Sequence, residues 1–496
     1  MDINKNKDIF GMIFFALSIL VLAYMFICPL TQVISHIDEY FTISVVQLPI
    51  REIITVNSWD VHPPLYYLMG KLAAKLSAML GINGLYGLKV LSIIPYLLIL
   101  IVSATKIRKD YGWFSTGLFT FSLAVMSEFF RNFLTIRMYS WGILFILLAF
   151  LSFREIINDT SDRKSWILLT AFSILCAYTH NFAALTAGCI YLALLGYIIT
   201  NNKEALKNWG ISVAGAIILY IPWMFSLINQ MTLVHESYWI PEVTLEKIIH
   251  FFGYYAYTSD TFFAIIAIAI LAIILMVYLK DSKTLDQKDQ YLILSGIGIY
   301  AGTIILGVLI SLVFKPIIVT RYLMFATAIL WLTISIVLSK MEYRKTFLIS
   351  FALICLLLVS GIATTISTND DIYKSGIAQK EVLDNITQDN NSMTIVNRQH
   401  LIMYFLSYTN QTDMYYLNVG HVFGVNMNTL HKLYDFKTFN GTEVDDLIAN
   451  NTNKNIYLIS WNEPQIATPT ELLAKETGIY FSKVNTDNLT STNSTT

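Results

Sequence analysis

Long apolar runs, each of roughly 20 residues, recur along the first three quarters of the chain and alternate with short polar segments. Runs of this length are typical of helices that span a membrane. The pattern predicts eleven spans, at residues 9–30, 85–105, 112–130, 138–153, 166–180, 183–199, 209–229, 261–279, 291–314, 321–339 and 346–366. The chain is therefore predicted to be an all-α polytopic membrane protein.

The fifth and sixth predicted spans are short, and a His-Asn break at 180–181 separates them. They could instead form one long broken helix, which would reverse the side of every later segment. Lys and Arg favour two separate spans, because with eleven spans they concentrate in the N-terminus and in the loops on its side of the membrane. This asymmetry predicts a cytoplasmic N-terminus and an exterior C-terminal tail. The membrane would be the plasma membrane of a prokaryote or the endoplasmic reticulum of a eukaryote.

Residues 1–366 are predicted to form the transmembrane domain, and the polar, Asn- and Thr-rich stretch at 367–485 a small exterior α/β domain. Helix-like patches at 379–389, 400–408 and 444–449 alternate there with strand-like patches at 393–396, 414–417 and 456–459. Asn-x-Ser/Thr sequons cluster in this tail, as an exterior position predicts, although such a composition also produces sequons by chance. Residues 486–496 are predicted to be disordered.

Composition excludes several other classes of protein. Hydrophobic residues make up 55% of the chain and charged residues only 14%, with a mean hydropathy of +0.57, whereas soluble domains carry about 25% charged residues. The net charge of −1 leaves no basic surface for nucleic acid. All four cysteines fall in apolar spans, so neither a disulfide framework nor a CxxC metal site is predicted.

The first exterior loop, residues 31–84, is too long for a simple connector and too apolar for free solution. Its amphipathic patches at 40–56 and 65–80 predict interfacial helices, and Pro63-Pro64 can open the second of them. Asp38 and Glu39 lie at the start of this loop, beside the exterior membrane surface. A carboxylate in such a place can act as a general base. The alternative is an acidic pair that only ends a helix or faces solvent.

Arg137 and Arg321 open the fourth and tenth predicted spans at their exterior ends. The planar fork of an Arg side chain binds phosphate oxygens in a bidentate manner, so both residues are candidates for contact with a lipid phosphate. The alternative is a snorkelling anchor, which needs no ligand.

Other polar side chains are candidates for substrate contact. His180 interrupts an apolar stretch, and polar groups at this depth face a cavity or a partner, although a structural histidine is the commoner case. Trp239 could stack on a sugar or anchor the interface. Asp60 and His62 could hold a divalent metal, but two ligands without a third are a weak signal. No cofactor is therefore predicted.

At these positions the chain resembles a GT-C glycosyltransferase. It is similar to the branch that contains protein O-mannosyltransferases, aminoarabinose transferases of lipid A and RgtA/B/C/D-like enzymes. The resemblance rests on Asp38-Glu39, HPPLYY at 62–67, Arg137-Met138-Tyr139 with Tyr178-Thr179-His180, and Thr320-Arg321-Tyr322-Leu323. One position departs from the pattern, because Thr135 stands where many relatives carry Glu. Either that carboxylate is dispensable, or Glu128 replaces it, or the acceptor differs.

The resemblance implies an inverting transfer of a sugar from a polyprenyl- or dolichyl-phosphate donor in the membrane to an acceptor hydroxyl outside. The acceptor could be a protein, a glycolipid or a polysaccharide. Asp38 and Glu39 would be the catalytic pair, with Asp38 as the general base, and Arg137 and Arg321 would bind the donor phosphate. The implied substrate-binding residues are His62, Tyr139, His180, Tyr322 and Trp239. A nucleotide-sugar donor is disfavoured, because the exterior loops lack a DxD metal motif.

Two alternative functions are a transporter and a membrane sensor with an exterior ligand-binding domain. A transporter would be expected to show inverted repeats and charges near the midplane of several helices, whereas polar residues here gather at the exterior ends. A sensor would explain the tail but not the long acidic first loop.

Overall fold

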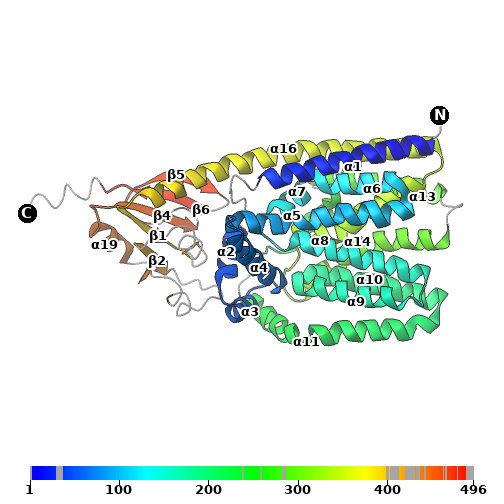
Figure 1. Cartoon of the computed structure of the whole chain (residues 1–496), viewed down its shortest axis with the longest axis horizontal. Helices are drawn as coiled ribbons and strands as arrows, with labels where there is room; N and C mark the ends of the chain where they lie inside the picture. Colours follow the sequence, from blue (N-terminus) through cyan, green and yellow to red (C-terminus); the bar gives the residue numbers. More distant parts are fainter. Residues whose placement is uncertain are drawn as a thin grey trace, which may run out of the picture.

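The computed structural model describes residues 3–28, 37–236, 240–256, 260–281, 286–397, 401–402, 413–418, 431, 436–440, 443–461, 463, 466–476 and 479–486. Each of the eleven predicted spans corresponds to a helix in this part of the chain. These helices are α1 (Ile3–Ile27), α5 (Gly84–Val102), α6 (Arg108–Val125), α8 (Tyr139–Asn158), α9 (Arg163–Thr179), α10 (Asn181–Asn201), α11 (Leu206–Glu236), α13 (Thr261–Asp281), α14 (Gln287–Val313), α15 (Met324–Lys340) and α16 (Arg344–Gln388). They lie roughly along one direction in a long bundle (Figure 1).

Within the described residues, nine helical stretches are long and apolar enough to cross a membrane, and two features reconcile this number with eleven spans. Helix α9 is short, with 17 residues. The stretch Gly84–Val125 reverses at Gly112, whose φ of 80° and ψ of −179° suit glycine alone. Thr116 Oγ1 then meets the Ser103 carbonyl at 3.4 Å, and Tyr96 Oη meets the Thr120 carbonyl at 3.1 Å. These bonds show two antiparallel helices.

The break at His180 also separates two antiparallel helices, α9 and α10. His180 is extended, with φ of −160° and ψ of 136°, and its Nδ1 accepts the Phe182 N–H at 3.0 Å, which caps the start of α10. Near the other end of the pair, Asn202 Nδ2 donates to Thr160 Oγ1 at 2.7 Å. The chain therefore turns back at His180, and the alternative of one broken helix is wrong.

Short helices gather where the bundle meets the C-terminal sheet (Figure 1). The first loop contains α2 (Ile37–Gln47), α3 (Ile50–Trp59) and α4 (Leu65–Met79). Pro49 divides the predicted patch at 40–56 between α2 and α3, and Pro64 precedes the first turn of α4, where a proline is tolerated. Two further short helices are α7 (Ser127–Leu134) and α12 (Leu245–Gly253).

The C-terminal part is the predicted α/β unit. Its elements are β1 (Ser392–Val396), β2 (Met414–Asn418), β3 (Lys437–Asn440), α19 (Val444–Ala449), β4 (Asn455–Trp461), β5 (Thr470–Glu476) and β6 (Ile479–Val484). The sheet order is β3-β2-β1-β4-β6-β5, with β1 to β4 mutually parallel and β6 antiparallel to both neighbours. The three predicted strands and the helix at 444–449 are confirmed. The patch at 379–389 is almost entirely the end of α16, and most of the patch at 400–408 lies outside the described residues.

Candidate active site

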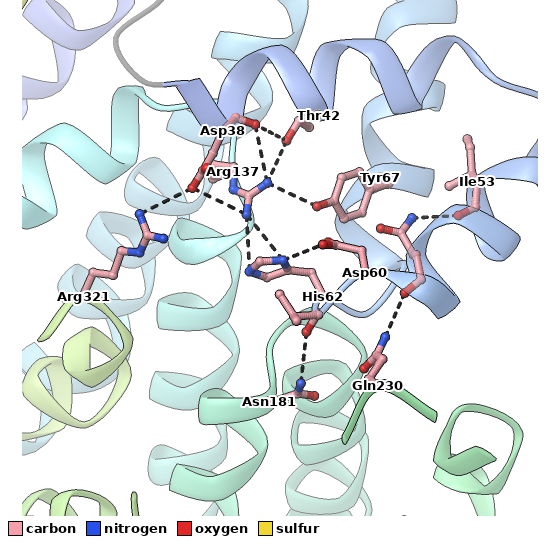
Figure 2. A network of polar contacts seen from close by, with 12 residues as sticks. Asp38, Thr42, Ile53, Asp60, His62, Tyr67, Arg137, Asn181, Gln230 and Arg321 are labelled. Carbon is pink, nitrogen blue, oxygen red and sulfur yellow. Dashed lines mark hydrogen bonds and ion pairs between the residues drawn. The ribbon is translucent and has the colours of Figure 1, made fainter. Parts of the chain in front are cut away.

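Three charged residues far apart in sequence meet at the end of the bundle beside α2 to α4 (Figure 2). Asp38 lies in the first turn of α2, and its side chain is 27% exposed. Its Oδ2 lies 3.4 Å from Arg321 Nη1 and 3.8 Å from Arg137 Nη2. Charge-assisted hydrogen bonds are usually about 2.7–2.9 Å long, so both ion pairs are loose. The structure thus brings the predicted base and both predicted phosphate ligands together.

Arg137 is the most enclosed member of the group. It follows α7 and is buried, with Nη1 lying 3.2 Å from Tyr67 Oη and 3.3 Å from Thr42 Oγ1. Its Nε has no hydrogen-bond partner among the described residues. Burial opposes the charge, but the oxygens of Tyr67 and Asp38 outweigh it and raise the pKa of Arg137, so the guanidinium stays charged.

His62 connects Arg137 to a second carboxylate. His62 Nδ1 lies 3.0 Å from Asp60 Oδ2, and Nε2 lies 3.3 Å from Arg137 Nη2. Burial and the charge of Arg137 lower the pKa of His62, which favours a neutral ring that donates from Nδ1 and accepts at Nε2. Burial would raise the pKa of Asp60, but the hydrogen bond from His62 and the charge of Arg137 lower it overall. Asp60 is therefore ionised.

His180 lies in a cluster of aromatic rings beside these charges. Its ring centroid is 4.7 Å from that of Tyr322, 5.5 Å from that of Tyr139 and 5.6 Å from that of His62. Because Nδ1 accepts the Phe182 N–H, a neutral ring carries its proton on Nε2. This Nε2 and the Tyr139 hydroxyl are buried without hydrogen-bond partners among the described residues. Two polar groups in the cluster thus form no hydrogen bond with any described residue.

Glu39 is placed differently from its neighbour Asp38. Glu39 is fully buried, and its carboxylate accepts hydrogen bonds from Lys89 Nζ and from the backbone N–H of Ile136. Any part that Glu39 plays in catalysis therefore acts through Lys89 and Ile136. Trp239, the remaining predicted substrate ligand, lies outside the described residues.

Thr135, the position that departs from the family pattern, forms a local hydrogen bond. Thr135 Oγ1 donates to the Arg131 carbonyl at 2.8 Å, which satisfies the C-terminus of α7. Glu128, the alternative carboxylate, forms an ion pair of 3.6 Å with Arg131 in the same helix. The structure thus assigns both side chains to local contacts within or at the end of α7.

Sequence reasoning missed Thr42, Tyr67 and Lys89 as members of this network. Tyr67 ends the HPPLYY segment, so the signal for it was already in view. Lys89 is a lone cation in an apolar span, which is a functional signal in membrane proteins. No group of three or more His, Cys, Asp or Glu side chains that could hold a metal occurs among the described residues.

The sequence matches no protein-family model and no curated protein. Solved structures do match. ArnT from Cupriavidus metallidurans in the apo state superposes with a TM-score of 0.60 at 10% identity, over 94% of this chain and 97% of that chain. ArnT bound to undecaprenyl phosphate gives a TM-score of 0.58 at 10% identity, over 95% of this chain and 97% of that one. The chain has the ArnT fold. The likeness to ArnT extends over almost the whole chain, which confirms the predicted all-α polytopic fold with a small C-terminal sheet domain.

Proposed function

We propose that the protein is a membrane glycosyltransferase that moves a sugar from a polyprenyl-phosphate donor to an acceptor hydroxyl on the exterior face, with inversion. The observation that carries this proposal is one partly exposed carboxylate, Asp38, which faces the guanidinium groups of both Arg137 and Arg321. The ArnT structure of the same fold is bound to undecaprenyl phosphate, which supports a lipid phosphate as the donor's carrier.

The two arginines suit a phosphate that arrives from the membrane. Each guanidinium can bind two phosphate oxygens, and the loose contacts with Asp38 are exchanged for shorter ones when an anion enters. The sugar must then lie between the carboxylate and the phosphate, so the two ion pairs of Asp38 open as the donor binds. The cations meanwhile stabilise the charge of the departing phosphate.

The reaction is a single displacement. The acceptor oxygen attacks the anomeric carbon on the face opposite the phosphate, while Asp38 takes the hydroxyl proton. A new bond forms from carbon to the acceptor oxygen, and the bond from carbon to the phosphate oxygen breaks. Polyprenyl phosphate leaves as an anion between Arg137 and Arg321. Attack from the opposite face inverts the anomeric configuration, and the anionic leaving group needs no general acid.

The orientation of the chain in the membrane fits this scheme. The Lys and Arg asymmetry of the loops puts the N-terminus in the cytoplasm, and an odd number of spans then puts α2 and the sheet outside. The acceptor approaches from that side, and the isoprenoid tail of the donor stays in the bilayer. His62, Tyr139, His180 and Tyr322 would contact the sugar or orient the groups that do.

A transfer assay tests the proposal. Purified protein in nanodiscs is given a panel of radiolabelled polyprenyl-phosphate sugars with candidate acceptors. The wild type should transfer one of them, and Asp38→Asn should lower transfer by roughly 10²–10⁴ while undecaprenyl phosphate still binds. Asp289→Asn, at the opposite end of the bundle, is the matched control. Unchanged transfer by Asp38→Asn would refute the base assignment, and absence of undecaprenyl phosphate binding by the wild type would refute the donor class.

A further inference from the structure

The second acid on α2, Glu39, holds three parts of the fold together. Lys89 Nζ, from α5, lies 2.9 Å from Glu39 Oε1 and 3.1 Å from Oε2. The backbone N–H of Ile136 donates to Oε1 at 2.6 Å. Ile136 lies in the turn between α7 and α8, one residue before Arg137. One carboxylate therefore joins α2, α5 and the turn that presents Arg137.

Stability alone does not explain this charge pair. The side chains of Glu39 and Lys89 are 0% and 5% exposed, and Lys89 lies in an otherwise apolar span. Desolvation makes a buried ion pair no better for stability than a well-packed apolar pair of similar volume. An apolar pair, however, could not accept the N–H of Ile136, which is itself completely buried. The carboxylate supplies the acceptor that this N–H needs, and the Lys89 ammonium group donates to both oxygens of the same carboxylate.

The bond from Ile136 also sets the register of the catalytic groups. Two consecutive residues of α2 contact two consecutive residues of the turn: Asp38 contacts Arg137, and Glu39 contacts Ile136. Fixing Glu39 to the backbone of Ile136 thereby fixes the separation between the Asp38 carboxylate and the Arg137 guanidinium. The Asp38 carbonyl also accepts from Arg137 Nη1, at 3.5 Å, so the two segments are joined twice.

We propose that Glu39 and Lys89 are positioning residues that hold the turn carrying Arg137 in register with Asp38. This inference rests on the proposed function, and it assigns a role to Lys89 and a mechanism to Glu39. Neither residue touches the donor or the acceptor. Their effect on the reaction passes through the hydrogen bond to Ile136.

Two double variants isolate that hydrogen bond. Glu39→Gln with Lys89→Met removes both charges but keeps a side-chain oxygen for the Ile136 N–H. Glu39→Leu with Lys89→Met removes both charges and that oxygen. Neither variant leaves a buried charge unpaired, so both should fold, and their melting temperatures report whether they do. A displacement of about 1 Å in a catalytic group can cost about a hundredfold in rate. We therefore expect the kcat of the Leu variant to be at least about tenfold below that of the Gln variant.

Equal kcat values in two folded variants would overturn the proposal. So would a loss in the Leu variant that merely follows a lower melting temperature and disappears on cooling. Amide hydrogen exchange at residues 135–138 gives a measure that needs no catalysis, and it should be faster in the Leu variant. If the wild type transfers no sugar, the proposed function fails, and this exchange difference still decides whether the turn is held by residue 39. Equal exchange would then overturn the positioning role.

Discussion

Ion pairs at the two ends of the helix bundle differ in length. At the end where the N-terminus lies, Arg154 Nη1 is 2.5 Å from Asp110 Oδ2, and Lys340 Nζ is 2.6 Å from Asp289 Oδ2. At the end beside the sheet, Arg137 and Arg321 share Asp38 at 3.8 and 3.4 Å. Short pairs leave little room for a competing anion, whereas loose pairs to one shared carboxylate can be replaced. The two short pairs hold protein segments together, whereas the proposed function assigns the two loose pairs to the binding of a ligand.

Replacing one arginine at each end of the bundle should give the largest difference between the two ends. Arg137→Met should lower transfer by about 10²–10³, because it removes a preorganised donor to the leaving phosphate. Arg154→Met should lower the free energy of unfolding by about 1–3 kcal/mol, because the partly buried Asp110 loses its partner. It should leave kcat within about threefold. Transfer assays and thermal unfolding on both variants measure the difference, and equal losses of transfer would contradict it.

Changing the shape of the cation without its charge gives a smaller effect. Arg321→Lys keeps a positive charge beside Asp38 but loses the planar fork that binds two oxygens. The donor KM should rise about tenfold, with a smaller change in kcat. Lys340→Arg, at the other end, should leave both constants unchanged, because its partner Asp289 is a protein group rather than a ligand. Steady-state kinetics over donor concentration decide this, and an unaltered KM in Arg321→Lys would argue against phosphate contact.

Acidification should loosen the sheet-facing end first. Burial and Arg137 lower the pKa of His62 below its ordinary 6.5, so the unfolded chain takes up a proton before the folded one does. Stability from this group is therefore complete above about pH 6.5 and decreases as pH falls below it. Near the folded pKa, protonated His62 would face Arg137, with Asp60, Asp38 and His180 also nearby. Melting temperature followed against pH should show this decline in the wild type.

His62→Gln is the control for that experiment, because it keeps a hydrogen-bonding side chain that does not titrate. Its melting temperature should be less sensitive between about pH 6.5 and 5. The contribution of Asp60 belongs to a separate window. The lowered pKa of Asp60 means that its stabilisation is present above the ordinary value of 3.8 and is lost as pH falls through the folded value. If the melting temperatures of both proteins fall equally between pH 6.5 and 5, His62 does not cause the decline.

The smallest expected effect on transfer is that of a substitution at the N-terminal end. Lys7 is buried, and its Nζ donates to the carbonyls of Met341 at 2.6 Å and Ser339 at 3.0 Å, at the end of α15. Lys7→Met should lower the free energy of unfolding by about 1.5–3 kcal/mol, because it removes charged hydrogen bonds from helix-end carbonyls. Transfer should change by less than twofold. A loss of activity without a loss of stability would break the division between the two ends.

Much of the membrane domain could be predicted because apolar length is a strong local signal. All eleven spans have helices, and the ambiguous pair was separated by a feature that sequence could only suggest, the extended backbone of His180. The C-terminal sheet was harder to predict. Strands β1, β2 and β4 are compact apolar runs, whereas β5 has no regular alternation of buried and exposed residues and contains an irregularity between Leu472 and Ala474. Local composition does not show such an edge strand.

The candidate site shows the same limit. Asp38, Arg137 and Arg321 were identifiable one at a time, because each is a charge at an apolar boundary. Their convergence depends on the packing of α2, α8 and α15, which no single-chain pattern records. Lys89 was missed because its surroundings are typical of lipid-facing sequence. Only the fold reveals that its ammonium group points at Glu39 rather than at the bilayer.

Helix α16 has 45 residues and continues without a break from the bundle into the C-terminal α/β unit (Figure 1). At 1.5 Å per residue it is about 68 Å long, more than twice the thickness of a hydrocarbon layer of about 30 Å. Thr365 Oγ1 fastens it to the Val125 carbonyl, and Ser375 Oγ to the Lys475 carbonyl of β5. The number of residues in α16 therefore sets both the distance of the sheet from the bundle and the rotation of the sheet about the helix axis. One residue inserted between these two fastenings would rotate the sheet by about 100° about the helix axis, a change that a flexible linker would absorb.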